Sequence, residues 1–275
     1  MKNHRLLLAL GIAALALASR EAWADPHPLP FSYPYATLPR GLSEIEQYMD
    51  MTPVNALVDG QTGERGNTLR GIFVTELEYG LTDRLELGLY MQFSNDITGL
   101  SSGQHPLQFD GVKQRLRYRF ADPGAWPVNV AIYGEVAELA NELELESKII
   151  LERRVGRWQF IANMTAEREI YYREPDEWVL MPSGGTSFEI TPALHLGVEY
   201  WGHAEYPNED EPRTFNALWH HYVGPAFLFQ TSHFWLAAAP YVRLDRLNRA
   251  GESRTGVSPD EFGRFWFRTI VGIDL

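Results

Sequence analysis

The sequence has 275 residues, of which 24 are Lys or Arg and 36 are Asp or Glu, and its formal net charge is −12. Such an acidic chain lacks the basic footprint that nucleic-acid binding needs, so we expect no nucleic-acid partner. The chain contains no cysteine, which excludes a disulfide framework and any metal site or nucleophile built from cysteine. Aromatic residues make up 13% of the chain, and this composition favours strands.

The first 24 residues have the pattern of an export signal. A basic start precedes an apolar stretch over residues 6–18, and Ala22 and Ala24 provide small residues at positions −3 and −1 of a cleavage site. The apolar stretch is too short to span a bilayer as a helix. We therefore expect residues 1–24 to be a cleaved signal peptide, and an uncleaved N-terminal anchor is the alternative.

A proline-rich segment follows the predicted signal peptide. Residues 25–40 contain five prolines, which disfavour both a helix and a central strand. We expect this segment to be an extended leader ahead of the first strand. No linker rich in Pro, Gly or Ser divides the rest of the chain, so residues 41–275 are expected to form one domain.

The main structural signal is a two-residue period that persists over long segments. Between residues 112 and 120 the even positions are mostly apolar, and the odd positions are the basic residues Lys113, Arg115, Arg117 and Arg119. A helix would mix these residues around its circumference, whereas a strand separates them onto two faces. The same separation recurs over residues 73–79, 85–93, 142–152 and 264–275.

This alternation predicts twelve strands along the chain. They are expected near residues 42–52, 70–80, 83–94, 110–121, 127–138, 142–153, 157–170, 177–190, 193–204, 216–230, 234–245 and 262–275. The eighth and tenth strands are the least regular, because Pro182 and Pro225 interrupt them and proline is confined to strand edges or bulges.

The connections between these strands alternate between short turns and longer polar loops. Longer loops are expected near residues 53–69, 95–109, 171–176, 205–215 and 246–261, and the link at 139–141 is short where a long one is expected. Short turns at one end and long loops at the other are typical of outer-membrane barrels, in which the turns face the periplasm.

Three features favour a barrel in a membrane over a sheet in water. Strands of about 10–14 residues match what a tilted strand needs to cross a bilayer, whereas soluble strands are usually about 5–6 residues long. The apolar faces tend to end in aromatic residues, as in the girdles of outer-membrane barrels. Residues 265–275 form an alternating last strand of the kind that the outer-membrane insertion machinery recognises. A large periplasmic β-sandwich is the alternative.

The predicted fold is therefore all-β, a transmembrane antiparallel up-and-down β-barrel of about twelve strands over residues 41–275. Its expected location is the outer membrane of a Gram-negative bacterium, with outer-membrane lipid and the insertion machinery as partners. Residues 75–87, Thr-Glu-Leu-Glu-Tyr-Gly-Leu-Thr-Asp-Arg-Leu-Glu-Leu, resemble a hairpin of proteobacterial outer-membrane barrels of the phenol-degradation meta-pathway family. The resemblance implies a barrel of about twelve strands and a transporter or channel for small organic molecules, and it carries over no catalytic residue.

If the apolar faces meet lipid, the charged faces line the lumen. The expected selectivity lining is Lys113, Arg115, Arg117, Arg119, Glu76, Glu78, Glu86, Glu144, Glu146, Arg264 and Arg268. One interpretation is a basic ladder that faces acidic residues across an open pore and selects solutes, which makes the protein a passive channel or transporter for small solutes. The other is a structural or assembly barrel filled by salt-bridge ladders. Twelve strands are compatible with both.

Metal and enzyme chemistry have little support in the sequence. His220 and His221 are adjacent and therefore point to opposite faces of a strand. His195 and His203 share a face but lie about 26 Å apart. No metal site and no cofactor are predicted. A lipid-modifying outer-membrane hydrolase is a further alternative, but the chain has no Gly-x-Ser-x-Gly motif, and we expect the protein not to be an enzyme.

Overall fold

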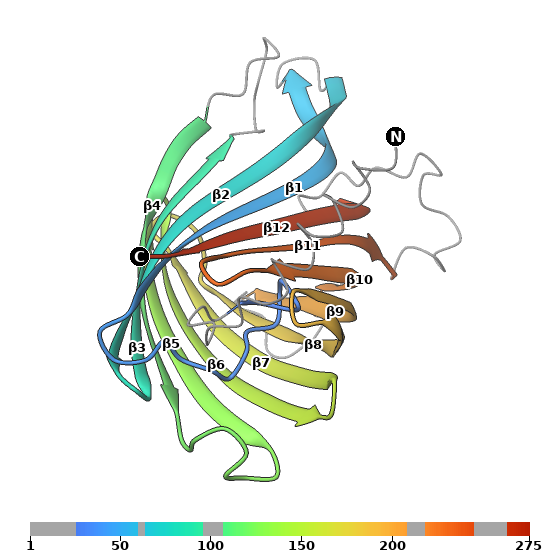
Figure 1. The fold of residues 1–275 in the computed structure, drawn as a ribbon. Coiled ribbons are helices and arrows are strands. Elements are labelled where there is room, and N and C mark those ends of the chain that lie inside the picture. The colour runs from blue at the N-terminus through green and yellow to red at the C-terminus, as the bar shows by residue number, and fades with distance from the viewer. Residues whose placement is uncertain (1–25, 60–63, 96–106, 208–217, 245–262) are drawn as a thin grey trace, which may run out of the picture.

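The computed structural model describes residues 26–59, 64–95, 107–207, 218–244 and 263–275. The predicted signal peptide and most of the loops expected near 95–109, 205–215 and 246–261 lie outside the described residues. Twelve strands form one closed barrel (Figure 1). They are β1 (Ser43–Asp59), β2 (Glu64–Thr82), β3 (Leu85–Asn95), β4 (Leu107–Arg119), β5 (Asn129–Leu139), β6 (Glu142–Val155), β7 (Trp158–Tyr171), β8 (Glu177–Thr191), β9 (Leu194–Pro207), β10 (Leu218–Gln230), β11 (Phe234–Arg243) and β12 (Phe265–Asp274).

Every strand pairs antiparallel with its neighbours in sequence, and β12 pairs with β1 to close the sheet. Closure leaves no strand edge, so every strand finds backbone partners on both sides. The predicted all-β, twelve-stranded antiparallel barrel is thereby confirmed. No helix in the described part of the chain is long and apolar enough to cross a membrane.

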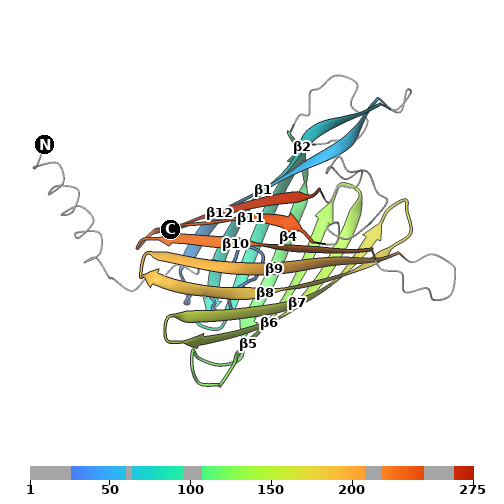
Figure 2. The same ribbon diagram turned by 90° about the vertical axis from the view of Figure 1, so that its right-hand side faces the viewer.

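The first hairpin is longer than predicted. The sequence suggests a loop over residues 53–69, but β1 continues to Asp59 and β2 begins at Glu64, with paired residues from Pro53 and Leu69 onward. These two strands reach beyond their neighbours at one end of the barrel (Figure 2). The prediction of a loop was wrong because Pro53 and the polar composition are typical of loops, whereas the pairing of β1 with β2 continues there through backbone hydrogen bonds without a regular apolar face.

The two strands that seemed least regular are continuous. In β8, pairing with β9 is interrupted between Leu180 and Ser183, around Pro182. In β10, pairing with β11 stops at Val223 and resumes at Phe227, around Pro225. Proline lacks the backbone N–H that a ladder needs, so the barrel accommodates each proline by a local gap rather than by ending the strand.

The wall separates its faces as the alternation predicts. Arg115 and Arg117 are 1% and 0% exposed, whereas Leu116 between them is 48% exposed on the outside. Tyr118, Phe120 and Trp126 form a row of ring contacts on the outside near the short turns. Other outward aromatics lie toward the opposite end, among them Phe109, Trp178, Trp219 and Phe265. This exterior is apolar with aromatic residues at both ends, as lipid contact requires.

The proline-rich leader lies inside the barrel. Residues 26–42, here called the leader, run through the interior and lead into β1 (Figure 1). Leu29, Tyr35 and Leu38 are almost fully buried. The leader leaves the lumen at the end that carries the short turns, here called the turn end, where Arg40 N–H donates to Asp83 Oδ1 at 3.1 Å. The other end, which carries the long loops, is called the loop end.

Candidate functional site: the occupied lumen

Wall side chains hold the leader by its backbone. The N–H of Phe31 donates to the Glu199 carboxylate at 3.1 Å, and the N–H of Leu38 donates to Glu86 Oε2 at 2.6 Å. Asn163 makes two such bonds to Tyr33, accepting from its N–H at 2.7 Å and donating to its carbonyl at 3.1 Å. A buried segment with few regular partners needs such bonds to satisfy its peptide groups, and the prolines reduce the number of donors.

Phe31 occupies a slot lined by aromatic residues of four neighbouring strands. Its ring stacks on Trp201 of β9 at 4.2 Å between centroids and meets Tyr241 of β11 edge-on at 5.2 Å. Trp266 of β12 lies edge-on at 6.1 Å. Tyr222 of β10 stacks on the far face of this group against Trp201 at 4.2 Å. These rings form the aromatic slot, and the leader fills it with one of its own side chains.

Two further leader side chains lie deeper in the charged region of the lumen. Lys148 Nζ lies 4.0 Å from the centre of the Tyr33 ring. Burial raises the pKa of Tyr33, and the charge of Glu76 raises it further, so the phenol is neutral. Burial lowers the pKa of His27, and the nearby positive charges of Arg117 and Arg115 lower it further, so the imidazole is neutral as well.

The middle of the predicted basic ladder lies in a buried ion-pair cluster on adjacent strands. Arg115 Nη2 lies 2.8 Å from Glu76 Oε1 and also contacts Glu78, and its Nη1 lies 2.6 Å from Glu86 Oε1. Arg117 Nη2 shares the same Glu86 oxygen at 2.8 Å. These five residues form the central charge cluster. The paired carboxylates come from the neighbouring strands β2 and β3, so this part of the ladder fits the interpretation of salt-bridge ladders better than that of a ladder facing acidic residues across an open pore.

The other predicted lining residues are distributed along the lumen. Arg119 Nη1 lies 3.4 Å from Asp122 at the turn end. Arg268 Nε donates to Asp50 Oδ1 of β1 at 2.6 Å. Arg264 stands apart from these groups, just before β12, with its guanidinium 5.5 Å from the Phe265 ring centre. The structure therefore does not gather the eleven predicted residues into one lining.

An acidic patch lies on the lumen side toward the loop end. Lys113 Nζ lies 2.9 Å from Glu144 and 3.6 Å from Glu135, and Lys148 Nζ lies 3.0 Å from Glu146. The register of β5, β6 and β7 aligns further carboxylates with these residues. The acidic patch consists of Glu135, Glu142, Glu144, Glu146, Glu167 and Glu169, with Lys113 and Lys148 among them. Its six carboxylates outnumber its two cations.

Comparisons with solved structures identify the architecture. The COG4313 outer membrane channel from Pseudomonas putida F1 superposes with a TM-score of 0.60 at 11% identity, covering 88% of this chain and 98% of that chain. The NanC porin gives a TM-score of 0.54 at 10% identity, covering 85% of this chain and 100% of that chain. The chain has the fold of an outer-membrane channel. No protein-family model and no curated protein sequence matches it.

The predicted location in the outer membrane of a Gram-negative bacterium agrees with the apolar exterior of the barrel and with the fold that it shares with outer-membrane channels. The meta-pathway family suggested by residues 75–87 is not confirmed by these matches, which support the broader class of outer-membrane channels and porins.

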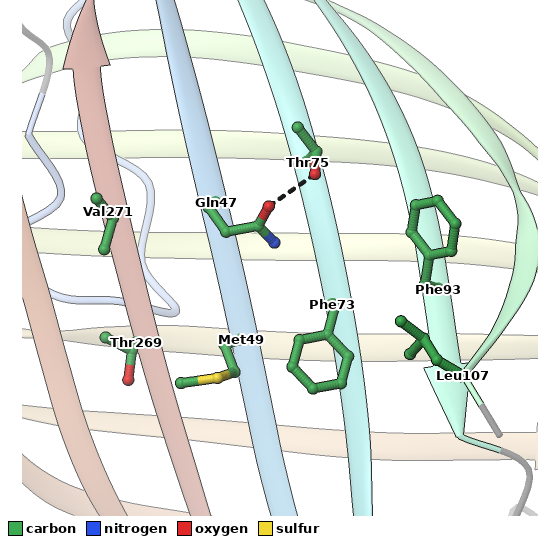
Figure 3. A pocket seen from close by; sticks show the side chains of 8 residues that line it. All are labelled: Gln47, Met49, Phe73, Thr75, Phe93, Leu107, Thr269 and Val271. Carbon is green, nitrogen blue, oxygen red and sulfur yellow. Dashed lines mark hydrogen bonds between the residues drawn. The ribbon is translucent and has the colours of Figure 1, made fainter. Parts of the chain in front are cut away.

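A hollow of about 310 Å³ lies on the outside of the wall (Figure 3). Thr75 Oγ1 donates to Gln47 Oε1 at 2.7 Å within it. It is lined by Gln47, Met49, Phe73, Thr75, Phe93, Leu107, Thr269 and Val271. These side chains point away from the lumen, so the hollow takes no part in a path through the barrel.

The contribution of the leader to the lumen was missed by the sequence analysis, although one signal was present. Leu29, Phe31, Tyr33 and Tyr35 occupy every second position between the prolines. This is the pattern of an extended segment with a buried face, and it distinguishes the leader from a solvated linker. The histidines behave as expected from adjacency, because His220 is buried on the lumen side while His221 stacks on the outward Trp219.

Proposed function

We propose that the protein is an outer-membrane channel for small solutes and that the leader closes it in this conformation. The observation that carries the proposal is which segment of the chain occupies the lumen. Side chains of the strands occupy part of this lumen, and a segment that precedes the first strand fills the space between them. Such a segment is able to leave the lumen without breaking the barrel ladder. The proposal contains no catalytic step.

Two features support small organic solutes with an aromatic ring. The aromatic slot holds the ring of Phe31 between Trp201 and Tyr241, so its shape suits a flat ring once the leader withdraws. The resemblance of residues 75–87 to meta-pathway barrels points to the same class of solute. The acidic patch at the loop end would in addition favour solutes and ions with a positive charge.

Planar-bilayer recording tests the role of the leader. The mature chain and a variant that lacks residues 26–38 are reconstituted separately. We expect rare or small conductance steps from the mature chain and frequent, larger steps from the shortened one, because removing the leader leaves the wall intact. Equal conductance of the two proteins, or no steps from either, would contradict a channel closed by its leader.

The solute class is tested in the shortened barrel. Benzyltrimethylammonium is permanently charged and aromatic, so we expect it to interrupt the current more strongly than tetramethylammonium does. Trp201→Ala should weaken the difference by about two- to tenfold, since one stacking contact contributes about 0.5–1.5 kcal/mol. Trp219→Ala, on the outside of the wall, is the matched control. Equal block by both cations would argue against an aromatic slot in the path.

A further inference from the structure

Three buried carboxylates converge at the edge of the central charge cluster, to which one of them, Glu78, belongs. Glu44 and Glu46 come from β1 and Glu78 from β2, and each is 0% exposed. One oxygen of each lies within 4.8 Å of the others. Oε1 of Glu46 and Oε2 of Glu78 have no hydrogen-bond partner among the described residues. Like charges so close together in a buried site repel one another unless a proton or a cation lies between them.

A histidine of the leader points at this group from a different part of the chain. His27 is fully buried, and neither of its ring nitrogens has a hydrogen-bond partner within the described ranges. Its Nε2 lies 3.8 Å from Glu46 Oε1. The ring is held by stacking on Trp235 at 5.5 Å and by an edge contact with Tyr33 at 4.8 Å. A buried imidazole with both nitrogens idle is unusual, because buried polar atoms are normally satisfied.

The spacing fits two ligands of one metal ion. A distance of 3.8 Å is too long for a hydrogen bond. Nitrogen and oxygen ligands bound at about 2.0–2.2 Å to a tetrahedral ion lie about 3.4–3.6 Å apart. Small shifts of the side chains would therefore bring His27 and Glu46 onto a shared ion.

The cations beside the group are shared with other carboxylates, and Arg117 Nη2 lies 3.9 Å from Glu78 Oε1. Arg115 contacts only Oε1 of Glu78 and is shared with Glu76 and Glu86. Arg268 is occupied by Asp50. Trp235 Nε1 donates to Glu44, which orients this carboxylate but adds no positive charge. A divalent ion between the three carboxylates would reduce the repulsion among them.

We propose that His27, Glu44, Glu46 and Glu78 bind one divalent first-row transition-metal ion. An imidazole with three carboxylates suits Zn²⁺ or Mn²⁺, whereas Ca²⁺ prefers sites made wholly of oxygen ligands. The ion would join the leader, through His27, to strands β1 and β2. This inference deepens the proposed function, because a metal bound in this way holds the leader inside the lumen.

Metal binding is measured directly on the mature, chelator-treated protein in detergent. Titration with Mn²⁺ is followed by electron paramagnetic resonance, and Zn²⁺ is added as a competitor. We expect one high-affinity Mn²⁺ per chain, with coupling to an imidazole nitrogen, that Zn²⁺ displaces. In His27→Ala the nitrogen coupling should vanish and the affinity should fall at least tenfold. His195→Ala, another buried lumen histidine, should bind like the parent chain.

Folding does not limit this test, since His27 lies outside the barrel strands. Glu46→Gln is the second variant, and its folded state is checked by its mobility in unheated gels. The proposal is overturned if the mature chain binds neither ion, or if His27→Ala keeps both the affinity and the nitrogen coupling. The result is independent of conduction. A leader that binds metal in a barrel that never conducts would contradict the proposed function and leave the metal site standing.

Discussion

The guanidinium carbon of Arg268 lies 3.6 Å from the centre of the Phe31 ring, so the last strand of the barrel rests directly on the leader. The same guanidinium pairs with Asp50 of the first strand at 2.6 Å, and its Nη1 donates to the Pro30 carbonyl at 3.5 Å. The leader is thus anchored where β12 meets β1. The attraction between a cation and an aromatic face is stronger in a site without water than at the protein surface.

Phe31→Ala should loosen the leader. Phe31 is partly buried against the aromatic slot, so its truncation should cost less than the about 3–5 kcal/mol that is typical of a fully buried phenylalanine. The loss falls on the docked leader because the barrel strands keep their own contacts. The measurement is the rate at which chymotrypsin cleaves after Tyr35, which is buried in the parent protein. We expect cleavage to be at least tenfold faster. Phe267→Ala, which removes an outward ring, is the control, and equal acceleration in both variants would contradict the anchoring role of Phe31.

Arg115→Leu should destabilise the barrel far more than the loss of an exposed ion pair. The substitution leaves Glu76 and Glu78 buried without their nearest cation, while Glu86 keeps Arg117. Breaking a buried pair costs about 3–5 kcal/mol. Arg84→Leu breaks an exposed pair with Asp122 at the turn end, where solvent screens the charges, and should hardly change the unfolding midpoint. Urea unfolding in detergent compares the two, and similar midpoints would show that the central charge cluster is not a buried unit.

Gly88→Ala tests whether Arg115 needs the open space above β3. A Cβ at Gly88 would lie 2.5 Å from Glu76 Oε1 and 2.7 Å from Arg115 Nε. Both atoms belong to the central charge cluster, so the cluster has to shift, at a cost of about 1–3 kcal/mol. At Gly134 of β5 the nearest atom to a new Cβ is 4.0 Å away, and Gly134→Ala should unfold like the parent chain. A lower midpoint for both variants would assign the effect to glycine flexibility instead.

The strands could be predicted from the sequence because lipid imposes one simple rule on them. Each strand needs an apolar outward face. In β4 this requirement is visible in the sequence as the alternation of the outward Leu116 with the inward Arg115 and Arg117. The prediction weakens where the rule does not apply. At the far end of β1 and β2, pairing beyond Pro53 depends on backbone bonds, which the alternation of side chains does not reveal.

The contents of the lumen were harder to predict, because they depend on which distant segments meet. The alternation predicts that Arg115 points inward. Its acidic partners become known only from the strand register, which sets Glu86 of β3 opposite Arg117, next to Arg115 on the inward face. Nothing in the spacing of the prolines says that Phe31 reaches Trp201, which is 170 residues away in the chain. The alternation of residues 29–35 indicates a buried face, but a segment without a ladder has no register that would identify its partners.

A synthetic peptide of residues 26–40 should close the barrel that lacks the leader. The backbone N–H groups of residues 31, 33 and 38 donate hydrogen bonds to wall side chains, so a free peptide is able to make the same bonds. The leader joins the wall at the turn end, where Gly41 N–H donates to the Gly80 carbonyl at 2.8 Å, so the peptide should act when added from that side.

Conductance of the shortened barrel is recorded while the peptide is added to one chamber and then to the other. We expect a dose-dependent loss of open time when the peptide is added to the turn-end chamber only. The tether gives the leader an effective concentration of about 1 mM or more, so a free peptide should close the barrel at a comparable concentration. A peptide carrying Phe31→Ala should need about tenfold more material, since it lacks the ring that fills the aromatic slot. Equal closure from both chambers, or by both peptides, would mean that the peptide obstructs the barrel without docking as the leader does.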